Sequence, residues 1–425
     1  MKEMFRPFHI LTMSLFLSSC QSYTAQTHRV RQDFIDRRYS DALRDLDDSE
    51  VSTSSSSKLV YLLERSSILD RMGDGPKARQ TLFEADRLVD QLYRPSLVGE
   101  AASYIYNDSA SDYTGEDYEK VAIHTLLALS FLGDGKLKKA RVEARAINVR
   151  LNEINNFYKK NKNKYKEDAF ARFLSAMIFE SLGDYNNALV DYRAALRLYE
   201  GDYSRYFRTS TPVSLVRSMW WLARHRGKHA LQKKLKRSYP EVVKKIAYNA
   251  QMAHIVLISE VGYIAKKISK SFIFTWDQKP MRFSFPAIRL GSPGYWGKIG
   301  LYVDAEFYEG GRAQFLDNIA RETLEDSRAR YMIKMASRIV LKDQISQQAK
   351  KNFGVLGELA VSIFGAATEM ADTRAWTLLP SQYYVTRVAV KPGTHKLRVS
   401  GGGISSAVKI VTLKAGEFRF IRDKG

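Results

Sequence analysis

The segment LGDYNNALVDYRAAL, residues 182–196, decides the fold of this 425-residue chain. Small and aromatic residues recur in it at the spacing of a tight turn followed by one helix face: Gly183, Tyr185, Ala188, Tyr192 and Ala195. Glycine permits the positive φ with which a preceding helix ends, and alanine allows two helices to approach closely. The larger residues then fill the groove between neighbouring helix pairs. The segment therefore predicts the turn and second helix of a helical hairpin.

Weaker copies of the same pattern occur upstream. RRYSDALRDL contains Ala42, MGDGPKARQTLFEA contains Ala78, and LGDGKLKKARVEARAI contains Ala140. This is the pattern of the tetratricopeptide repeat, whose period is about 34 residues. Successive matching alanines, including Ala188, are 36, 62 and 48 residues apart, so insertions interrupt the array. We expect these insertions at 52–57, 102–119 and 158–166.

The second half of the chain changes from a helical to an alternating pattern. Basic helices are expected from Tyr203 to Gln251, followed by strands over His254–Gly262, Met281–Leu290 and Gly297–Phe307. Helices over 314–350 and 353–369 are expected next. Four alternating strands, with turns at 392–393, 401–403 and 415–416, then predict a β meander of sandwich type.

The predicted fold class is therefore α+β. It combines an N-terminal tetratricopeptide-like α-solenoid with insertions, residues 28–251, and a basic C-terminal β-sandwich-like domain with helices, residues 252–425. A solenoid of helical hairpins builds a concave surface that usually binds peptides or protein segments.

The N-terminus has the organisation of a secretory signal. Lys2 and Arg6 precede a short apolar run, His9–Leu17, which is too short to span a bilayer as a helix. The run leads into LFLSSCQS, residues 15–22, which contains the only cysteine of the chain. A plain signal peptide with a chance cysteine is one interpretation of this segment.

The other interpretation is a lipid anchor, because Leu17-Ser18-Ser19-Cys20 resembles the bacterial lipobox. The resemblance implies a lipoprotein signal peptide over residues 1–19, recognised by its peptidase at Leu17, Ser18 and Ser19. It also implies an acylated Cys20 at the start of a lipidated tether, residues 20–27, and several acyl chains bind a membrane firmly. Gln21, rather than aspartate, follows the cysteine, which implies the outer membrane and its periplasmic side.

The net charge of +21 is unevenly distributed. From Cys20 to Asp202 there are 27 Lys and Arg against 29 Asp and Glu, whereas from Tyr203 to Gly425 there are 38 against 16. A basic half of this kind favours an anionic neighbour. For a secreted protein we expect phospholipid headgroups, an anionic cell-wall polymer or an acidic protein, and no nucleic acid. The alternative is a basic background that only confers solubility.

No constellation of residues indicates catalysis, a cofactor or a metal. GSPGYWGKI, residues 291–299, lacks the spacing and the hydroxyl residue of a phosphate-binding loop. His225 and His229 are spaced for one helix face, but cationic neighbours surround them and no acidic third ligand is near. The sequence therefore predicts a protein that is not an enzyme.

Two segments supply candidate partner-binding residues. On the helix that precedes the best repeat, DAFARFLSAMIFESLGDY, the apolar positions are expected to pack inward. Arg172, Ser175 and Glu180 are then expected to be free to face a ligand. In DTRAWTLLP, residues 372–380, Arg374 and Trp376 form either a structural joint between helices and sheet or a docking surface.

The whole mature chain resembles a family of poorly characterised bacterial outer-membrane lipoproteins with tetratricopeptide-like repeats. The resemblance is carried by three segments, residues 115–145, 258–269 and 371–399, and the last is the most specific. It includes Arg374, Trp376, Arg387 and the turn at 392–393. Ala265 stands where a proline is expected. The resemblance implies the architecture and the compartment, and it does not imply an activity.

Together these observations lead us to expect a non-catalytic lipoprotein scaffold in the periplasm, which is anchored in the outer membrane and binds a protein partner of the envelope or cell-wall machinery. One alternative is a glycan-binding or glycan-cleaving envelope module. Another is an accessory protein for the assembly of a secretion system or surface structure.

Overall fold

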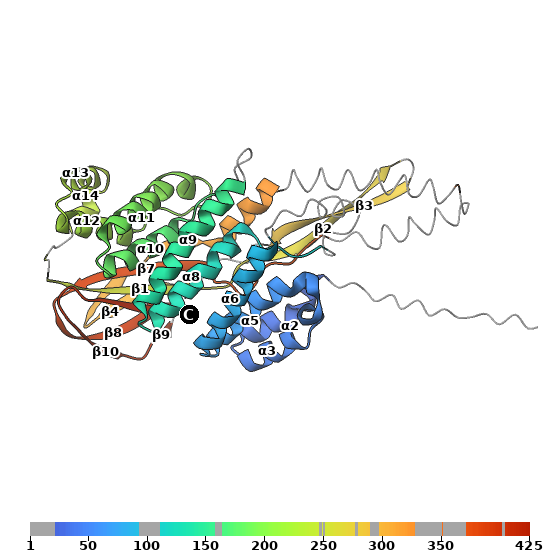
Figure 1. Ribbon diagram of the computed structural model, residues 1–425, viewed down its shortest axis with the longest axis horizontal. Coiled ribbons are helices and arrows are strands. Elements are labelled where there is room, and N and C mark those ends of the chain that lie inside the picture. The colour runs from blue at the N-terminus through green and yellow to red at the C-terminus, as the bar shows by residue number, and fades with distance from the viewer. Residues whose placement is uncertain are drawn as a thin grey trace, which may run out of the picture.

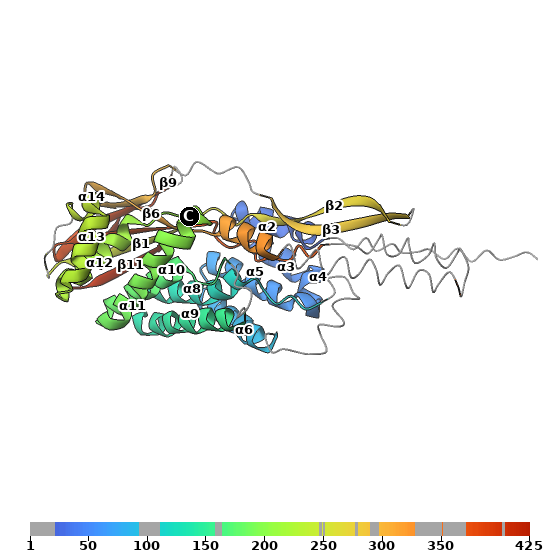
Figure 2. The ribbon, with the colours of Figure 1, turned by 90° about the horizontal axis from the view of Figure 1, so that it is seen from above.

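The computed structural model describes residues 22–92, 111–157, 164–245, 249, 251–276, 279–289, 297–327, 351, 371–401 and 404–425. In this part of the chain, a row of helices covers one side of paired β-sheets, and a two-stranded ribbon extends from one end (Figures 1 and 2). The element labels of Figure 1 are used throughout.

Helical hairpins follow one another along the first half of the chain (Figure 1). Their first helices are α2 (His28–Ile35), α5 (Lys58–Arg71), α8 (Asp117–Gly133), α10 (Ala169–Ser181) and α12 (Val213–His225). Their second helices are α3 (Tyr39–Asp47), α6 (Gly75–Leu92), α9 (Leu137–Phe157), α11 (Tyr185–Leu198) and α13 (His229–Ser238). Short helices lie beside them: α1 (Tyr23–Gln26), α4 (Glu50–Thr53) and α14 (Pro240–Val243). The predicted α-solenoid is confirmed.

Each hairpin turns at a residue with positive φ, as the glycine pattern predicted. Four of these residues are glycines, with φ between 60° and 87°: Gly73, Gly135, Gly183 and Gly227. In the α2–α3 hairpin the same place is taken by Arg37, at φ 63°. The matching alanines, Ala42, Ala78, Ala140 and Ala188, are all buried where two helices meet. The turn and the small contact residue therefore define the first four hairpins, whereas the α12–α13 hairpin has the turn glycine but Gln232 at the alanine position.

Two sheets form the β-sandwich. The strands of the first sheet lie in the order β11 (Phe418–Asp423), β1 (Ala253–Val261), β7 (Gln382–Val390) and β6 (Gly311–Phe315). Those of the second lie in the order β10 (Lys409–Leu413), β8 (Gly393–Gly401), β4 (Gly300–Val303) and β5 (Glu306–Glu309), and β9 (Ile404–Ser405) pairs with β8. Apolar side chains of both sheets share one core, among them Ile255, Leu301, Val388 and Leu397.

The last strands are not a simple meander, which corrects the prediction. Gly393, at φ 140°, starts β8 directly after the turn that follows β7, and these two strands belong to different sheets. The chain returns to the first sheet only as β11, which runs parallel to β1. The predicted turns at 392–393 and 415–416 are in place, and residues 402–403 of the third lie outside the described residues. The exchange between sheets depends on long-range pairing that alternation alone does not encode.

Of the other predicted strands, one is a hairpin and another is confirmed in a separate two-stranded ribbon. The single strand expected over Gly297–Phe307 is a hairpin of β4 and β5 that turns at Asp304, where φ is 53°. The strand expected over Met281–Leu290 is β3 (Lys279–Arg289), which pairs with β2 (Lys266–Trp276) as the ribbon that extends from the molecule (Figure 2). The long helix expected after β6 is described over residues 316–327.

The solenoid and the first sheet share one hydrophobic core. Every residue of α8 from Asp117 to Leu132 is buried, because α8 has the second helices on one side and the C-terminal half on the other. Leu127 and Phe170 of the solenoid belong to the same cluster as Val256 and Phe420 of the sheet. The boundary predicted at residue 251 therefore separates two chain segments that do not have separate cores.

Described residues of the tether and of the insertion at 158–166, of which 164–166 are described, contact distant parts of the chain. Tyr23, placed in the tether, is buried and donates its hydroxyl to Glu64, while the Thr24 hydroxyl donates to the carbonyl of Lys267. In the segment expected as a loop at 158–166, Tyr165 is buried and Lys164 pairs with Glu322 at 2.6 Å. Both segments contact residues that lie far away in sequence.

Leu17, Ser18, Ser19 and Cys20 lie outside the described residues, as does the helix expected at 353–369. The predicted lipid anchor therefore stays a prediction.

Candidate partner-binding site

The extended segment 371–381, called the strap here, crosses helices α5 and α8 and is held mainly through its own backbone. The backbone N–H of Trp376 donates to Glu119 at 2.8 Å, and that of Thr377 donates to Glu64 at 2.7 Å. The N–H of Leu378 donates to the second oxygen of Glu64 at 3.1 Å. Two carboxylates of the inner helices thus accept hydrogen bonds from backbone N–H groups of the strap, which has no neighbouring strand to accept them.

Arg374 and Trp376 belong to this joint and face no solvent. Trp376 is fully buried, and its indole N–H donates to Ser67 at 2.8 Å. The guanidinium of Arg374 donates to Asp372 and to the carbonyls of Ser56 and Ser111. Of the two interpretations open from the sequence, the structural joint agrees with this geometry. A docking surface at these residues does not, because both side chains are already enclosed.

The carboxylates under the strap lie in an unfavourable setting for charge. Burial, together with neighbouring Glu116, raises the pKa of Glu119 to about 7. Burial also raises the pKa of Glu64, although hydrogen bonds from Thr377 and Tyr23 oppose that shift. Carboxylates with raised pKa values are typical of functional sites, but Glu64 and Glu119 each accept hydrogen bonds from the chain itself. Their geometry serves attachment of the strap.

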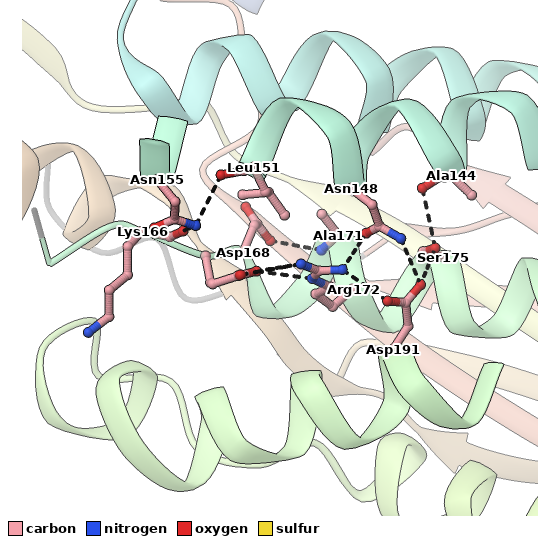
Figure 3. Close-up of polar contacts among 11 residues, drawn as sticks. Ala144, Asn148, Leu151, Asn155, Lys166, Asp168, Ala171, Arg172, Ser175 and Asp191 are labelled. Atoms are coloured by element: carbon pink, nitrogen blue, oxygen red, sulfur yellow. Dashed lines mark hydrogen bonds and ion pairs between the residues drawn. The ribbon is translucent and has the colours of Figure 1, made fainter. Parts of the chain in front are cut away.

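Figure 3 shows the surroundings of Arg172 and Ser175, which were expected to face a ligand. Arg172 donates to Asn148 at 2.6 Å and to Asp191 at 3.1 Å, and it also pairs with Glu167. Ser175 is fully buried and donates to Asp191 at 2.6 Å. Asp191 therefore joins helices α9, α10 and α11. The expectation that these side chains are free was wrong.

Glu180 is likewise enclosed, although it was expected to be free. Both of its oxygens accept hydrogen bonds from Arg387 of β7, at 2.7 and 2.9 Å, and Tyr192 donates to one of them. The Arg387 guanidinium is also stacked between Trp221, at 4.9 Å, and Phe418, at 4.8 Å. This buried pair joins the solenoid to the sheet. The sequence pattern missed it because its partner lies 207 residues away.

A third buried ionic cluster lies between helices α6, α8 and α9. The two ring nitrogens of His124 contact Glu143 at 3.0 Å and Asp86 at 3.2 Å. Arg150 pairs with the same Asp86 at 2.9 Å. Burial disfavours the charged ring, but the hydrogen bonds to Asp86 and Glu143 raise the pKa of His124 to about 9. The cluster thus holds a protonated histidine between two repeats.

The inner helices of the solenoid are therefore covered by the protein's own strap and sheet. The concave surface, which such arrays usually offer to a peptide, is filled along α8 and α10. A partner of the described part of the chain must use an outer surface.

A strongly charged outer surface of the described residues is the end of the solenoid, residues Arg224–Lys245, called the basic end here. It contains nine Lys or Arg and one acidic residue, Glu241, and all nine cations are exposed. Figure 1 places helices α12–α14 at the opposite end of the molecule's long axis from the ribbon. The uneven charge of the sequence indicated this half of the chain, but not that nine of its cations are exposed together at one end.

Within the described residues, no group of three or more His, Cys, Asp or Glu could hold a metal ion. The described helices are also all too short or too polar to span a membrane.

Among the comparisons with known proteins, only the search of solved structures found matches. No family model and no curated protein matches the chain. Among solved structures, it is similar to the nearly identical TPR-like repeats of a kinesin light chain-like protein from Podosopora anserina, and to a single-residue variant of those repeats. In both cases the identity is 12%, the match covers 52% of this chain and 94% of that one, and the TM-score is 0.33. The helical hairpins, their turns and their buried alanines are what identify the first half of the chain as a tetratricopeptide-like solenoid.

Proposed function

We propose that the protein is a non-catalytic scaffold of the bacterial cell envelope. In this proposal an acylated Cys20 anchors it to the outer membrane, facing the periplasm, and it binds a protein partner of the envelope or cell-wall machinery. The observation that carries the proposal is the array of helical hairpins, since such arrays commonly bind proteins. The lipobox-like Leu17-Ser18-Ser19-Cys20 supports the anchor.

The arrangement of ionic groups favours a scaffold over an enzyme. In the described part of the chain, the buried carboxylates Glu64, Glu119 and Glu180 each accept hydrogen bonds from distant segments of the chain. A general acid or base needs access to a substrate proton, whereas these groups hold the chain together. The exposed surface of the basic end carries cations, which suit recognition of a partner protein.

The anchor is tested by growing cells with a labelled fatty acid. We expect the wild-type chain to incorporate the label and Cys20→Ser to lose it and remain unprocessed. Ser19→Ala is the matched control, because it keeps a small residue before the cysteine and should label normally. A mature N-terminus other than Cys20 would overturn the lipoprotein assignment.

The scaffold is tested by cross-linking intact cells and purifying the protein with its partners. A reproducible protein partner that is absent from a control lipoprotein supports the proposal. Recovery of glycan strands without a protein partner would instead favour the glycan-binding alternative.

A further inference from the structure

A cavity of about 80 Å³ lies beside the basic end, where helix α12 meets the first sheet. His225 and Asn249 line it and are exposed, so the cavity reaches the surface. Its other described walls include Tyr185, Trp221 and Phe418. Neither the strap nor the buried ionic pairs of the solenoid fill this space.

Aromatic and aliphatic side chains form much of the cavity wall. The ring of Tyr185 lies 5.1 Å from that of His225, and the ring of His254 lies 5.1 Å from Trp221 and 4.8 Å from Phe418. Burial and nearby Arg387 lower the pKa of His254 to about 2, so this imidazole is uncharged at neutral pH. The wall therefore suits an apolar group.

The charges of the site are arranged around the cavity and not inside it. No Lys or Arg is among the described lining residues, whereas Glu180 is. An anion inside the cavity would meet that carboxylate. Outside it, Arg226 lies over the Tyr185 ring at 5.2 Å, and the exposed cations of α13 follow, including Lys233, Lys236 and Arg237. The site therefore has a cavity suited to an apolar group at its centre and exposed cations around it.

We propose that the cavity and the basic end together bind an acidic peptide segment of a protein partner, with one apolar side chain of that segment in the cavity. This proposal rests on the scaffold function and names the chemistry of its partner. A neutral sugar ring fits the site less well, because it would leave the exposed cations around the cavity without a partner of opposite charge. A lipid phosphate is the other anion that such cations can bind, and the test below distinguishes it from a peptide.

The test uses the full chain in a non-ionic detergent and two fluorescent polyglutamate peptides, one with a central phenylalanine and one with a central glycine. Fluorescence anisotropy should show binding of both, with the phenylalanine peptide roughly tenfold tighter because its ring leaves water. Binding of both should weaken as salt rises to about 0.15 M, since exposed charges are then screened. Equal affinities would overturn the proposed role of the cavity.

Variants separate the two parts of the site. Ala389→Phe, which places a ring in the cavity from β7, should remove the difference between the peptides and spare binding of the glycine peptide. Lys233→Glu, Lys236→Glu and Arg237→Glu together should weaken both peptides at least tenfold. The matched control reverses exposed charges elsewhere on the solenoid, Lys138→Glu, Arg145→Glu and Arg193→Glu, and should change binding little.

Further outcomes would overturn the proposal. One is an equal loss of binding in the control variant, which would show that the net charge of the protein alone determines its affinity for the peptides. Another concerns competition. If neither peptide displaces the other, but phosphatidylglycerol in mixed micelles displaces both, the site binds a lipid surface. If Ala389→Phe does not fold, the comparison of the two peptides on the wild-type chain still tests the role of the cavity. Failure of peptide binding with a partner still captured by cross-linking would reject this site and retain the scaffold.

Discussion

The inner face of the solenoid and its basic end are both rich in charge, but they use it in different ways. On the inner face Arg387 meets Glu180, and between the helices behind it His124 meets Asp86 and Glu143, with each group paired within the chain. On the basic end, cations such as Lys233 and Lys236 are exposed beside a single acidic residue of that segment. The first arrangement fixes one set of partners within the chain, and the second leaves its charge available to another molecule.

The physical basis of the difference is solvent. A buried charge that loses its partner retains the full cost of desolvation, whereas an exposed charge remains hydrated. Substitutions on the inner face should therefore alter stability, and substitutions on the basic end should alter binding. The following predictions test this contrast in order of expected effect.

Arg387→Leu should have the largest effect, because it leaves Glu180 buried without its cation. We expect the free energy of unfolding, measured by urea denaturation, to fall by about 3–5 kcal/mol. Combining it with Glu180→Leu should recover much of the loss, since a pair of apolar residues avoids the unpaired charge. A loss below about 1 kcal/mol for the single variant would contradict the importance of this pair.

The His124 cluster should make stability depend on pH. The folded pKa of about 9 lies above the free value near 6.5, so the protonated ring favours the folded state. This contribution, of the order of 3 kcal/mol, is fully present below pH 6.5 and is lost as pH rises through 9. Urea denaturation of the wild type and His124→Asn at a series of pH values measures it. An identical slope in both proteins would exclude His124 as its source.

Ala188→Leu tests the close approach of helices α10 and α11. Ala188 is fully buried, so extra methyl groups must displace its neighbours, and we expect a loss of about 1–3 kcal/mol. Val190→Leu is the control on the same helix, because Val190 is 62% exposed and should tolerate the change. Equal melting temperatures for the two variants would show that the hairpin does not need a small residue here.

Lys236→Ala on the basic end should have the smallest effect on folding. Its side chain is exposed, and surface substitutions of this kind usually change the free energy of unfolding by less than about 0.5 kcal/mol. Thermal denaturation checks the result. A loss as large as that of Ala188→Leu would remove the distinction between the two regions.

The repeats could be recognised from sequence because their signals are local. Gly183 and Ala188 lie five residues apart, and together they specify a turn and a close helix contact. The environment of Arg172 could not be recognised in this way. A polar residue between apolar positions of a helix is typical of an exposed face, but here Asn148 and Asp191 of neighbouring helices enclose it.

The strap shows the same limit more clearly. The sequence identified residues 372–380 as a distinctive segment and left a joint and a docking surface open. The choice depends on Glu64, which lies 313 residues from Thr377 in the chain and accepts two of its hydrogen bonds. No local pattern links these residues.

By itself, the sequence determined the hairpins, their turns, the strands' alternation and the concentration of positive charge in the second half. These properties follow from backbone preferences and from the period of apolar residues, which act over a few neighbouring positions. The tertiary structure alone decided that the solenoid's inner face is filled by the strap and first sheet, that Glu180 is enclosed, and that the basic end is open. The physical reason is that burial and pairing depend on which distant segments exclude water from a side chain.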